Sequence, residues 1–349
     1  VNSVPSVRNL KIPLFRSVGR VFFVTINSLA KIQSRTYNIK NNSFTEEFMA
    51  LSIREKYADM LKSIAQLSVA AGKIDETNVY QKEHPHTRKF MDMLVADNMA
   101  EGSHLEGKEN FRAFLDAVKA GKHGLILMEH YSNTDLPALC YLLEHDLGDE
   151  GKDLSKRIVA IAGMKLNEAD PLVRAFAESF TRVVIYPTRS LDKAEASAQS
   201  EQEKLEEEKR ARTINLAAMR AMDKCKRDGE VILVFPSGTR YRPGHPETKR
   251  GLREIDSYLR MFDIMILVTI NGSALTIDVN NPDDMLADIV APAVQIFSAS
   301  PVIDCKNFRK DYLATLPESE EDPKQKVIDH IMDLFDEQHE RIEKLKNAN

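Results

Sequence analysis

A histidine and an aspartate separated by four residues form the first pair of side chains that could do chemistry. His130 and Asp135 stand in the segment His-Tyr-Ser-Asn-Thr-Asp, directly after the apolar residues 124–128. The pattern predicts a strand, a loop and a helix, so both side chains would lie at the edge of a sheet where α/β folds bind ligands. A neutral imidazole held by a carboxylate can act as a general base. The alternative is that Thr134 or Asp135 only caps the helix and His130 is an incidental loop residue.

Two arginines follow a second apolar strand about 100 residues later. Residues 231–244 read Val-Ile-Leu-Val-Phe-Pro-Ser-Gly-Thr-Arg-Tyr-Arg-Pro-Gly, so a buried strand leads to a sharp turn at Ser237 and Gly238 and then to Arg240 and Arg242. Two guanidinium groups at alternate positions suit a phosphate, because each offers paired N–H donors. The alternative is a surface loop with two solvated arginines.

Two further cations follow strands that are expected to end at the same edge. Arg189 comes just after residues 182–186, and Lys165 follows residues 157–162. We expect Arg189 to join the two loop arginines around one anion, because parallel strands end at a common edge. Lys165 could support that anion, or it is an ordinary solvated lysine. Cys140, on an apolar helical stretch, is interpreted as a core residue and not as a nucleophile.

Alternating strands and helices must position these side chains. Strands are expected at residues 124–128, 157–162, 182–186, 231–235, 264–270 and 290–297. Helices are expected around residues 86–100, 109–120, 136–147, 171–180, 252–262 and 323–345, and in a long segment ending near 228. The acidic stretch 191–212 is interpreted as a solvated helix or excursion. The sequence therefore predicts an α/β fold, with a mostly parallel or mixed sheet covered by helices on both faces.

Charge and periodicity divide the chain into three expected parts. Residues 1–43 contain seven Lys/Arg and no Asp or Glu, and we interpret them as a basic arm that is a transit peptide, a membrane-surface contact or a tail. Residues 44–85 are expected to form a small helical domain, with a helix-start signature at Ser43 or Thr45 before two glutamates. Residues 86–349 form the expected α/β domain.

Composition excludes several classes of protein. A net charge of −5 in 349 residues and 43% hydrophobic residues indicate an ordinary globular chain, not a dedicated nucleic-acid binder. The longest apolar runs, residues 21–26 and 264–270, are too short to span a bilayer. The three cysteines are too far apart for a short-spaced metal site or a disulfide ladder, which favours a reducing compartment.

The two loop motifs carry a resemblance. His130-Tyr-Ser-Asn-Thr-Asp135, followed by Phe-Pro-Ser-Gly-Thr-Arg at residues 235–240, resembles the glycerolipid acyltransferase family, in which His-x4-Asp supplies the base and Pro-Glu/Ser-Gly-x-Arg holds the glycerol phosphate. Ser237, with the Arg-x-Arg of Arg240 and Arg242, is most similar to the soluble plastid-type glycerol-3-phosphate 1-acyltransferases. The likeness extends from about residue 82 to 297. It departs at residues 187–190, where Pro-Thr-Arg-Ser replaces a Lys/His cluster and leaves only Arg189 as a phosphate contact.

The resemblance implies acyl transfer from an acyl thioester to the sn-1 hydroxyl of glycerol 3-phosphate, which gives lysophosphatidate for phospholipid synthesis. His130 would be the general base and Asp135 would fix its tautomer, with no metal and no nucleotide cofactor. The implied donor is acyl-acyl carrier protein or acyl-coenzyme A. The expected place is the cytoplasm or an organelle stroma or matrix, in solution or in reversible contact with a membrane surface.

Three other functions stay open from the residues. The chain could be a 1-acylglycerol-3-phosphate acyltransferase, or a non-catalytic phospholipid or phosphometabolite binder in which the arginines matter and His130 does not. A thioester hydrolase of the α/β-hydrolase type would be expected to carry Gly-x-Ser-x-Gly, which this sequence lacks.

Overall fold

The computed structural model describes residues 12–17, 20–24, 51–168 and 171–348. The chain forms two compact units, Val1–Met49 and Ala50–Asn349. In the first unit, strands β1 (Ile12–Ser17) and β2 (Arg20–Val24) pair in the antiparallel sense. The rest of the basic arm lies outside the described residues. Its interpretation as a transit peptide, a membrane contact or a tail therefore stays a prediction.

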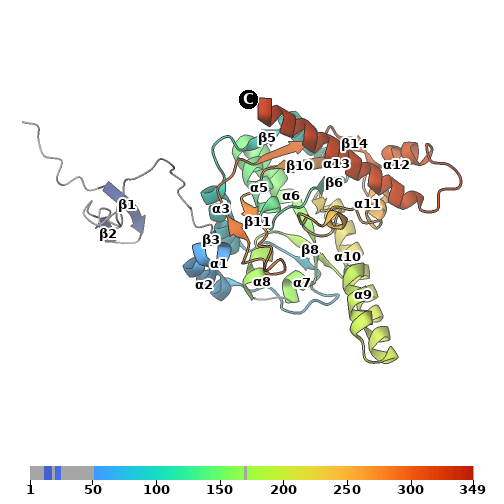
Figure 1. Ribbon diagram of the computed structural model, residues 1–349, viewed down its shortest axis with the longest axis horizontal. Helices are drawn as coiled ribbons and strands as arrows, with labels where there is room; N and C mark the ends of the chain where they lie inside the picture. The colour runs from blue at the N-terminus through green and yellow to red at the C-terminus, as the bar shows by residue number, and fades with distance from the viewer. Residues whose placement is uncertain (1–11, 18–19, 25–50, 169–170, 349) are drawn as a thin grey trace, which may run out of the picture. The chain divides into compact units, whose positions relative to one another are not determined.

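A nine-stranded mixed sheet lies at the centre of the second unit (Figure 1). The strands are arranged in the order β4 (Tyr80–Gln81), β8 (Arg182–Ile185), β7 (Ile158–Gly163), β9 (Val231–Val234), β6 (Gly124–Met128), β10 (Ile264–Asn271), β13 (Ile296–Ala299) and β5 (His104–Glu106), with β14 (Ile303–Asp304) paired to β10. The five strands from β8 to β10 are parallel, and β4, β13 and β14 pair with them in the antiparallel sense. The predicted α/β class is confirmed.

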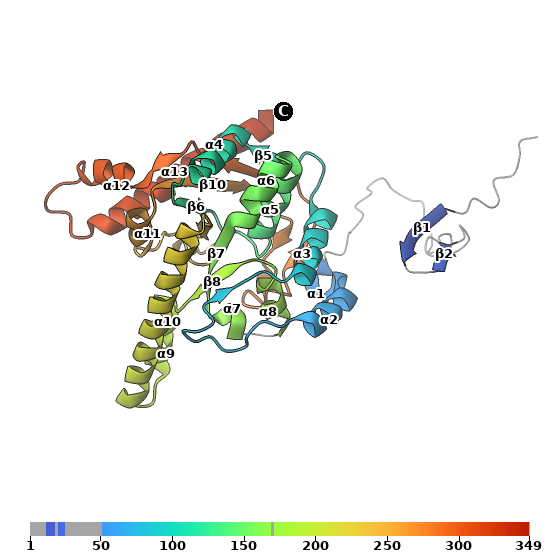
Figure 2. The same ribbon diagram turned by 180° about the vertical axis from the view of Figure 1, so that it is seen from behind.

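Helices cover both faces of the sheet because its central strands are apolar on both sides. β6, β9 and β10 are buried at every position, and alternate residues join opposite cores: Ile126 and Met128 face one, Leu125 and Leu127 the other. The first core is covered by α3 (Pro85–Asn98), α4 (Lys108–Lys119), α5 (Asp135–Asp146), α6 (Asp149–Arg157) and α8 (Pro171–Ala177), seen in Figure 2. The second is covered by α10 (Glu201–Arg227), α11 (Ile255–Met261), α12 (Cys305–Leu313) and α13 (Pro323–Ala348).

The prediction of one continuous strand over residues 290–297 is wrong. Two separate strands occupy this segment: β12 (Ile289–Val290) pairs with β11 (Leu275–Thr276) and β3 (Leu51–Ser52) in a small sheet, and β13 joins the main sheet. Pro292 stands between them and has no N–H to donate, so one continuous ladder through this segment is unfavourable.

The first described helices begin later than the sequence signature at residues 43–47, which lies outside the described residues. Ser52 caps α1 (Ile53–Lys56) in a capping box with Glu55, and α2 (Ala58–Leu67) follows after Tyr57. The segment 44–85 also contributes β4, the edge strand of the main sheet. The predicted boundary at residue 85 therefore stays a prediction, although Ala50–Asn349 forms one compact unit.

The acidic stretch 191–212 is largely helical. It spans most of α9 (Thr188–Ser197) and the start of α10, which lie side by side and project beyond the sheet (Figures 1 and 2). None of the helices in the described part of the chain combines the length and the apolar character that a bilayer span requires.

Close packing of α5 against α6 fixes the helix that begins with Asp135. Gly151 on α6 is buried against α5, and a methyl group built on it would lie 1.7 Å from the carbonyl oxygen of Leu143. The two helices can therefore approach this closely only because residue 151 has no side chain.

We expect Gly151→Ala to lower the free energy of unfolding by about 1–3 kcal/mol, because the added methyl group must push α6 away from α5. Denaturant unfolding followed by circular dichroism measures this change. Lys152→Ala, next along the same helix at an exposed position, is the matched control and should change stability by less than about 0.5 kcal/mol. Equal stability of the two variants would show that α5 and α6 can separate at no cost.

Candidate active site

The loops after β6 and β9 meet at one edge of the sheet. The two strands are parallel neighbours, so His130 after β6 and the arginine loop after β9 leave the sheet side by side. The N–H of Tyr241 donates to the carbonyl oxygen of His130 over 2.7 Å. The His130 ring stacks on Phe235, with the ring centroids 3.9 Å apart. The two sequence motifs therefore form one structural site.

Asp135 organises the His130 loop from the first turn of α5. Its side chain is 3% exposed and accepts four hydrogen bonds. His130 Nδ1 donates to Oδ2 over 2.9 Å, and the N–H groups of Tyr131 and Ser132 donate to the same oxygen over 2.6 and 2.9 Å. The Ser132 hydroxyl donates to Oδ1 over 2.7 Å. A carboxylate at a helix N-terminus is also favoured by the helix dipole, and by accepting from Nδ1 it fixes the His130 tautomer.

This arrangement leaves His130 Nε2 for chemistry. Nδ1 is occupied by Asp135, and within the described residues no hydrogen bond to Nε2 is found. The ring borders an apolar cavity of about 170 Å³. Apolar side chains from α1, α3, α5, β7 and α8 form most of its wall, among them Ile53, Met91, Leu136, Ile161, Val173 and Phe176. A basic nitrogen thus stands beside a space that suits a hydrocarbon chain.

Ser237 and Gly238 shape the turn that carries the arginines. Gly238 has a φ of 63°, a left-handed conformation that glycine adopts without strain. A side chain there would also collide with Leu252, whose Cδ1 lies 2.5 Å from the built methyl position. The Ser237 hydroxyl donates to the carbonyl oxygen of Thr239 over 2.7 Å. Both residues therefore set the conformation of the turn.

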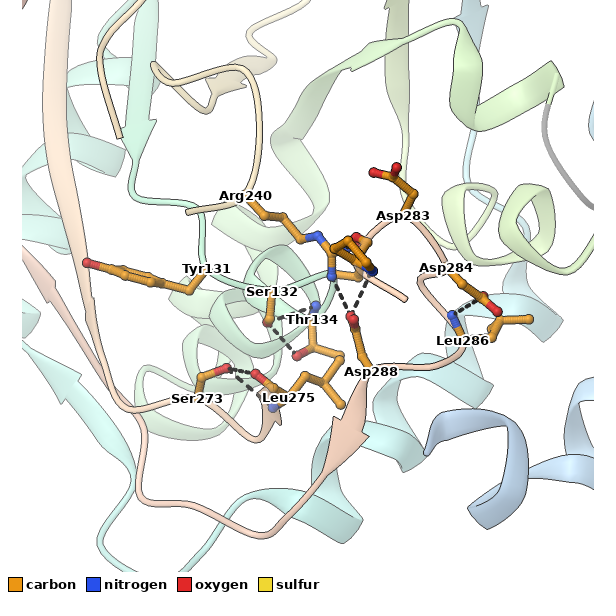
Figure 3. A network of polar contacts seen from close by, with 12 residues as sticks. Tyr131, Ser132, Thr134, Arg240, Ser273, Leu275, Asp283, Asp284, Leu286 and Asp288 are labelled. Carbon is orange, nitrogen blue, oxygen red and sulfur yellow. Dashed lines mark hydrogen bonds and ion pairs between the residues drawn. The ribbon is translucent and has the colours of Figure 1, made fainter. Parts of the chain in front are cut away.

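Three arginines pair with one acidic loop, residues 277–288, which we call the aspartate loop. Arg240 pairs with Asp288, as Figure 3 shows, and both side chains are buried. Arg242 pairs with Asp283 over 2.8 Å, and Arg54 of α1 pairs with Asp284 over 3.0 Å. The loop arginines are therefore compensated by carboxylates that lie more than 40 residues later in the chain.

Asp288 is the most unusual of these carboxylates. Its side chain is 1% exposed, and Oδ2 accepts from Arg240 and, over 3.3 Å, from Asn133 of the His130 loop. Oδ1 is buried and has no partner among the described residues. Burial raises the pKa of Asp288 to about 6, even though Arg240 opposes the shift. The surroundings of Asp288 therefore disfavour its negative charge, although Arg240 partly compensates it.

The other two predicted cations are exposed. Arg189 is on α9 and Lys165 is on α7 (Lys165–Glu168). Both follow parallel strands, as predicted, but within the described residues neither contacts His130, Arg240 or Arg242. Their phosphate-binding role stays a prediction. Cys140 is fully buried in α5, where burial raises the pKa of its thiol to about 11, consistent with a core residue.

A buried polar cluster behind His130 was missed in the sequence. Glu129 accepts hydrogen bonds from the N–H of Ile270 over 2.8 Å, from the Tyr131 hydroxyl over 2.9 Å and from His339 Nδ1 over 3.0 Å. His339 lies on α13, 210 residues later in the chain. The one local signal was a glutamate directly after an apolar strand, which requires a buried partner. The cluster ties the C-terminal helix to the His130 loop.

Burial opposes protonation of His339, but the hydrogen bond and charge of Glu129 outweigh it and raise its pKa above the usual value of 6.5. A raised pKa in the folded protein adds stability below the unfolded value, and this stability is lost as the pH rises through the folded value. We therefore expect His339→Gln to lose more unfolding free energy at about pH 6 than at about pH 9. Urea unfolding at both pH values measures this difference.

The matched control is His330→Gln on the same helix. His330 stacks on Phe308 and Tyr312 and is not paired with a carboxylate among the described residues. Its loss should cost a similar amount at both pH values. A loss at His339 that does not depend on pH would mean that the contact with Glu129 is a neutral hydrogen bond.

One known protein family matches the part of the chain that contains the His130 loop and the arginine loop. Residues 103–267 match the family model described as Acyltransferase. No curated protein sequence gives a significant match to the chain. No group of three His, Cys, Asp or Glu side chains in the described residues is arranged to hold a metal ion. The matched segment contains the His130 loop and the arginine loop, so this part of the chain is similar to the acyltransferase family.

Proposed function

We propose that the protein transfers a fatty acyl group from an acyl thioester to the sn-1 hydroxyl of glycerol 3-phosphate. The observation that carries this proposal is the His130–Asp135 pair, which borders an apolar cavity and is hydrogen-bonded through its backbone to the arginine loop. An acyl chain in the cavity would bring its thioester to the imidazole. Arg240 and Arg242 would hold the phosphate on the other side.

The mechanism follows from the position of His130 Nε2. Nε2 takes the proton of the acceptor hydroxyl while the oxygen attacks the thioester carbonyl carbon. Asp135 stabilises the imidazolium that forms, because its carboxylate already accepts from Nδ1. The tetrahedral intermediate then breaks its C–S bond, and the leaving thiolate takes the proton from Nε2. The products are the ester and a free thiol, and His130 is again neutral.

The apolar cavity favours acyl transfer over simple phosphate binding. A binder of a small phosphometabolite has no need of an apolar cavity beside the imidazole. Because the cavity would receive only the acyl chain, it does not distinguish acyl carrier protein from coenzyme A as the acyl carrier. A lysophosphatidate acceptor is the second substrate to test, since it carries the same phosphate.

His130→Ala should abolish acyl transfer and leave the fold intact, because base catalysis of this kind contributes roughly 10²–10⁴-fold. Adding Asp135→Ala should cost little more, since the two residues act as one unit. The assay follows labelled glycerol 3-phosphate into lysophosphatidate with acyl-coenzyme A and acyl-acyl carrier protein as donors. His145→Ala, an exposed histidine on the same helix as Asp135, should keep full activity. Full activity in His130→Ala would rule out the mechanism.

Arg242→Ala and Arg240→Ala should each raise the KM for glycerol 3-phosphate, because a hydrogen bond to a charged group contributes about 1.5–3 kcal/mol. Arg242 pairs with the exposed Asp283, so Arg242→Ala leaves no buried charge behind. Free glycerol should be a very poor acceptor for the wild-type protein. Arg253→Ala, which breaks an exposed pair with Asp322, is the control. Equal turnover of glycerol and glycerol 3-phosphate would contradict a phosphate role for the arginines.

A further inference from the structure

The buried pair between Arg240 and Asp288 stands where the proposed function needs a phosphate. Arg240 Nη1 donates to Asp288 Oδ2, and Nη2 donates to the carbonyl oxygen of Pro282 over 3.4 Å. The Arg240 side chain is 9% exposed. An anionic acceptor can therefore reach this guanidinium only by sharing it with Asp288 or by replacing the carboxylate.

Replacement of the Asp288 carboxylate by an anionic acceptor at Arg240 would move the Asp288 side chain and not its backbone. The carbonyl oxygen of Asp288 accepts from the N–H of Ile53 over 2.9 Å, and that of Leu286 accepts from the N–H of Arg54 over 3.0 Å. Asp288 also directly precedes β12, which is paired on both edges. The start of α1 and the small sheet thus hold this end of the aspartate loop in place.

Asp288 is a weak partner for Arg240 because its charge is poorly satisfied. Oδ1 is buried without a partner, and the second donor to Oδ2, Asn133, is 3.3 Å away. Asp284 and Asp278 of the same loop repel the charge further. A buried carboxylate in this condition has lost hydration that its hydrogen bonds do not fully replace. A competing anion with more charge and more oxygens can therefore displace it.

We propose that Asp288 is an affinity-determining residue of the acceptor site: it holds Arg240 until a dianionic phosphomonoester displaces it, and it thereby weakens the binding of every anionic acceptor. A phosphomonoester carries a charge of roughly −1.5 to −2 near neutral pH and three strong acceptor oxygens. It outweighs the single charge of a carboxylate. A phosphodiester carries one charge, so replacing Asp288 brings no electrostatic gain. This inference rests on the proposed role of Arg240 in phosphate binding.

The experiment compares two acceptors that differ by one methyl group: glycerol 3-phosphate and its phosphate methyl ester. Asp288→Asn removes the competing charge and keeps the size of the side chain. We expect it to lower the KM for glycerol 3-phosphate by roughly tenfold, and to raise kcat/KM for the methyl ester by a similar factor, because the same competitor is removed for both acceptors.

Asp284→Asn is the matched control. It removes one charge from the same loop, but its partner is the exposed Arg54 and not Arg240. The KM should not fall for either acceptor, because Asp288 keeps its charge and its pair with Arg240. Thermal melting checks that both variants fold. If Asp288→Asn does not fold, Asp288→Ser, which also lacks the charge and is smaller, takes its place with the same expected result.

Binding of inorganic phosphate, measured by calorimetry, separates this inference from the proposed function. If the wild type does not acylate glycerol 3-phosphate but Asp288→Asn binds phosphate more tightly than wild type and Asp284→Asn, the competition stands and the proposed reaction fails. If glycerol 3-phosphate is acylated but Asp288→Asn has an equal or higher KM, Asp288 only holds Arg240 in place and the inference is overturned. Unchanged phosphate binding in all three proteins also overturns it.

Discussion

The buried carboxylate of Asp135 is the contact on which the candidate site depends. Asp135 lies at the start of α5 and accepts four hydrogen bonds from three consecutive residues of the preceding loop. The loop after β6 therefore has one conformation in which all four donors are satisfied. That conformation turns the imidazole of His130 so that Nδ1 faces the carboxylate, while the residue also lines the cavity. The close contact of α5 with Gly151 of α6 holds the helix that presents the carboxylate.

Charge compensation governs the other half of the site. A guanidinium that is removed from water requires an anion, and Arg240 finds it in Asp288. The pairing compensates the charge of Arg240, so under the proposed function an anionic substrate competes with the protein's own carboxylate. The aspartate loop also carries Met285 and Leu286 into the wall of the apolar cavity. One segment therefore borders both the proposed phosphate site and the proposed acyl site.

The C-terminal helix α13 supports the His130 loop through Glu129. Glu129 cannot be buried alone at the end of β6, and His339 of α13 supplies a side-chain partner for its carboxylate. The backbone N–H of Ile270 completes the pocket for the carboxylate. The C-terminal helix is thus part of the framework of the site, although it lies beyond the segment that matches the acyltransferase family.

The sequence by itself determined the features that depend on residues close together in the chain. The alternation of apolar strands and amphipathic helices predicted the α/β class, and the short spacing of His130 and Asp135 across a strand end and a helix start predicted their contact, because five residues leave few other arrangements. The break at Pro292 is also present in the sequence as a missing N–H, although the apolar residues around it favour one continuous strand.

Only the tertiary structure decided which distant groups meet. Arg240 and Asp288 are 48 residues apart and Glu129 and His339 are 210 apart, and no periodicity specifies such pairs. The order of strands and helices predicted that Arg189 would follow a strand that ends at the same edge of the sheet as β6 and β9. The direction of its side chain depends on the helix in which it lies, and in α9 the side chain of Arg189 is exposed. The cavity is lined from α1, α3, α5, β7 and α8 and exists only once these elements pack, because a cavity is a property of their fit and not of any one of them.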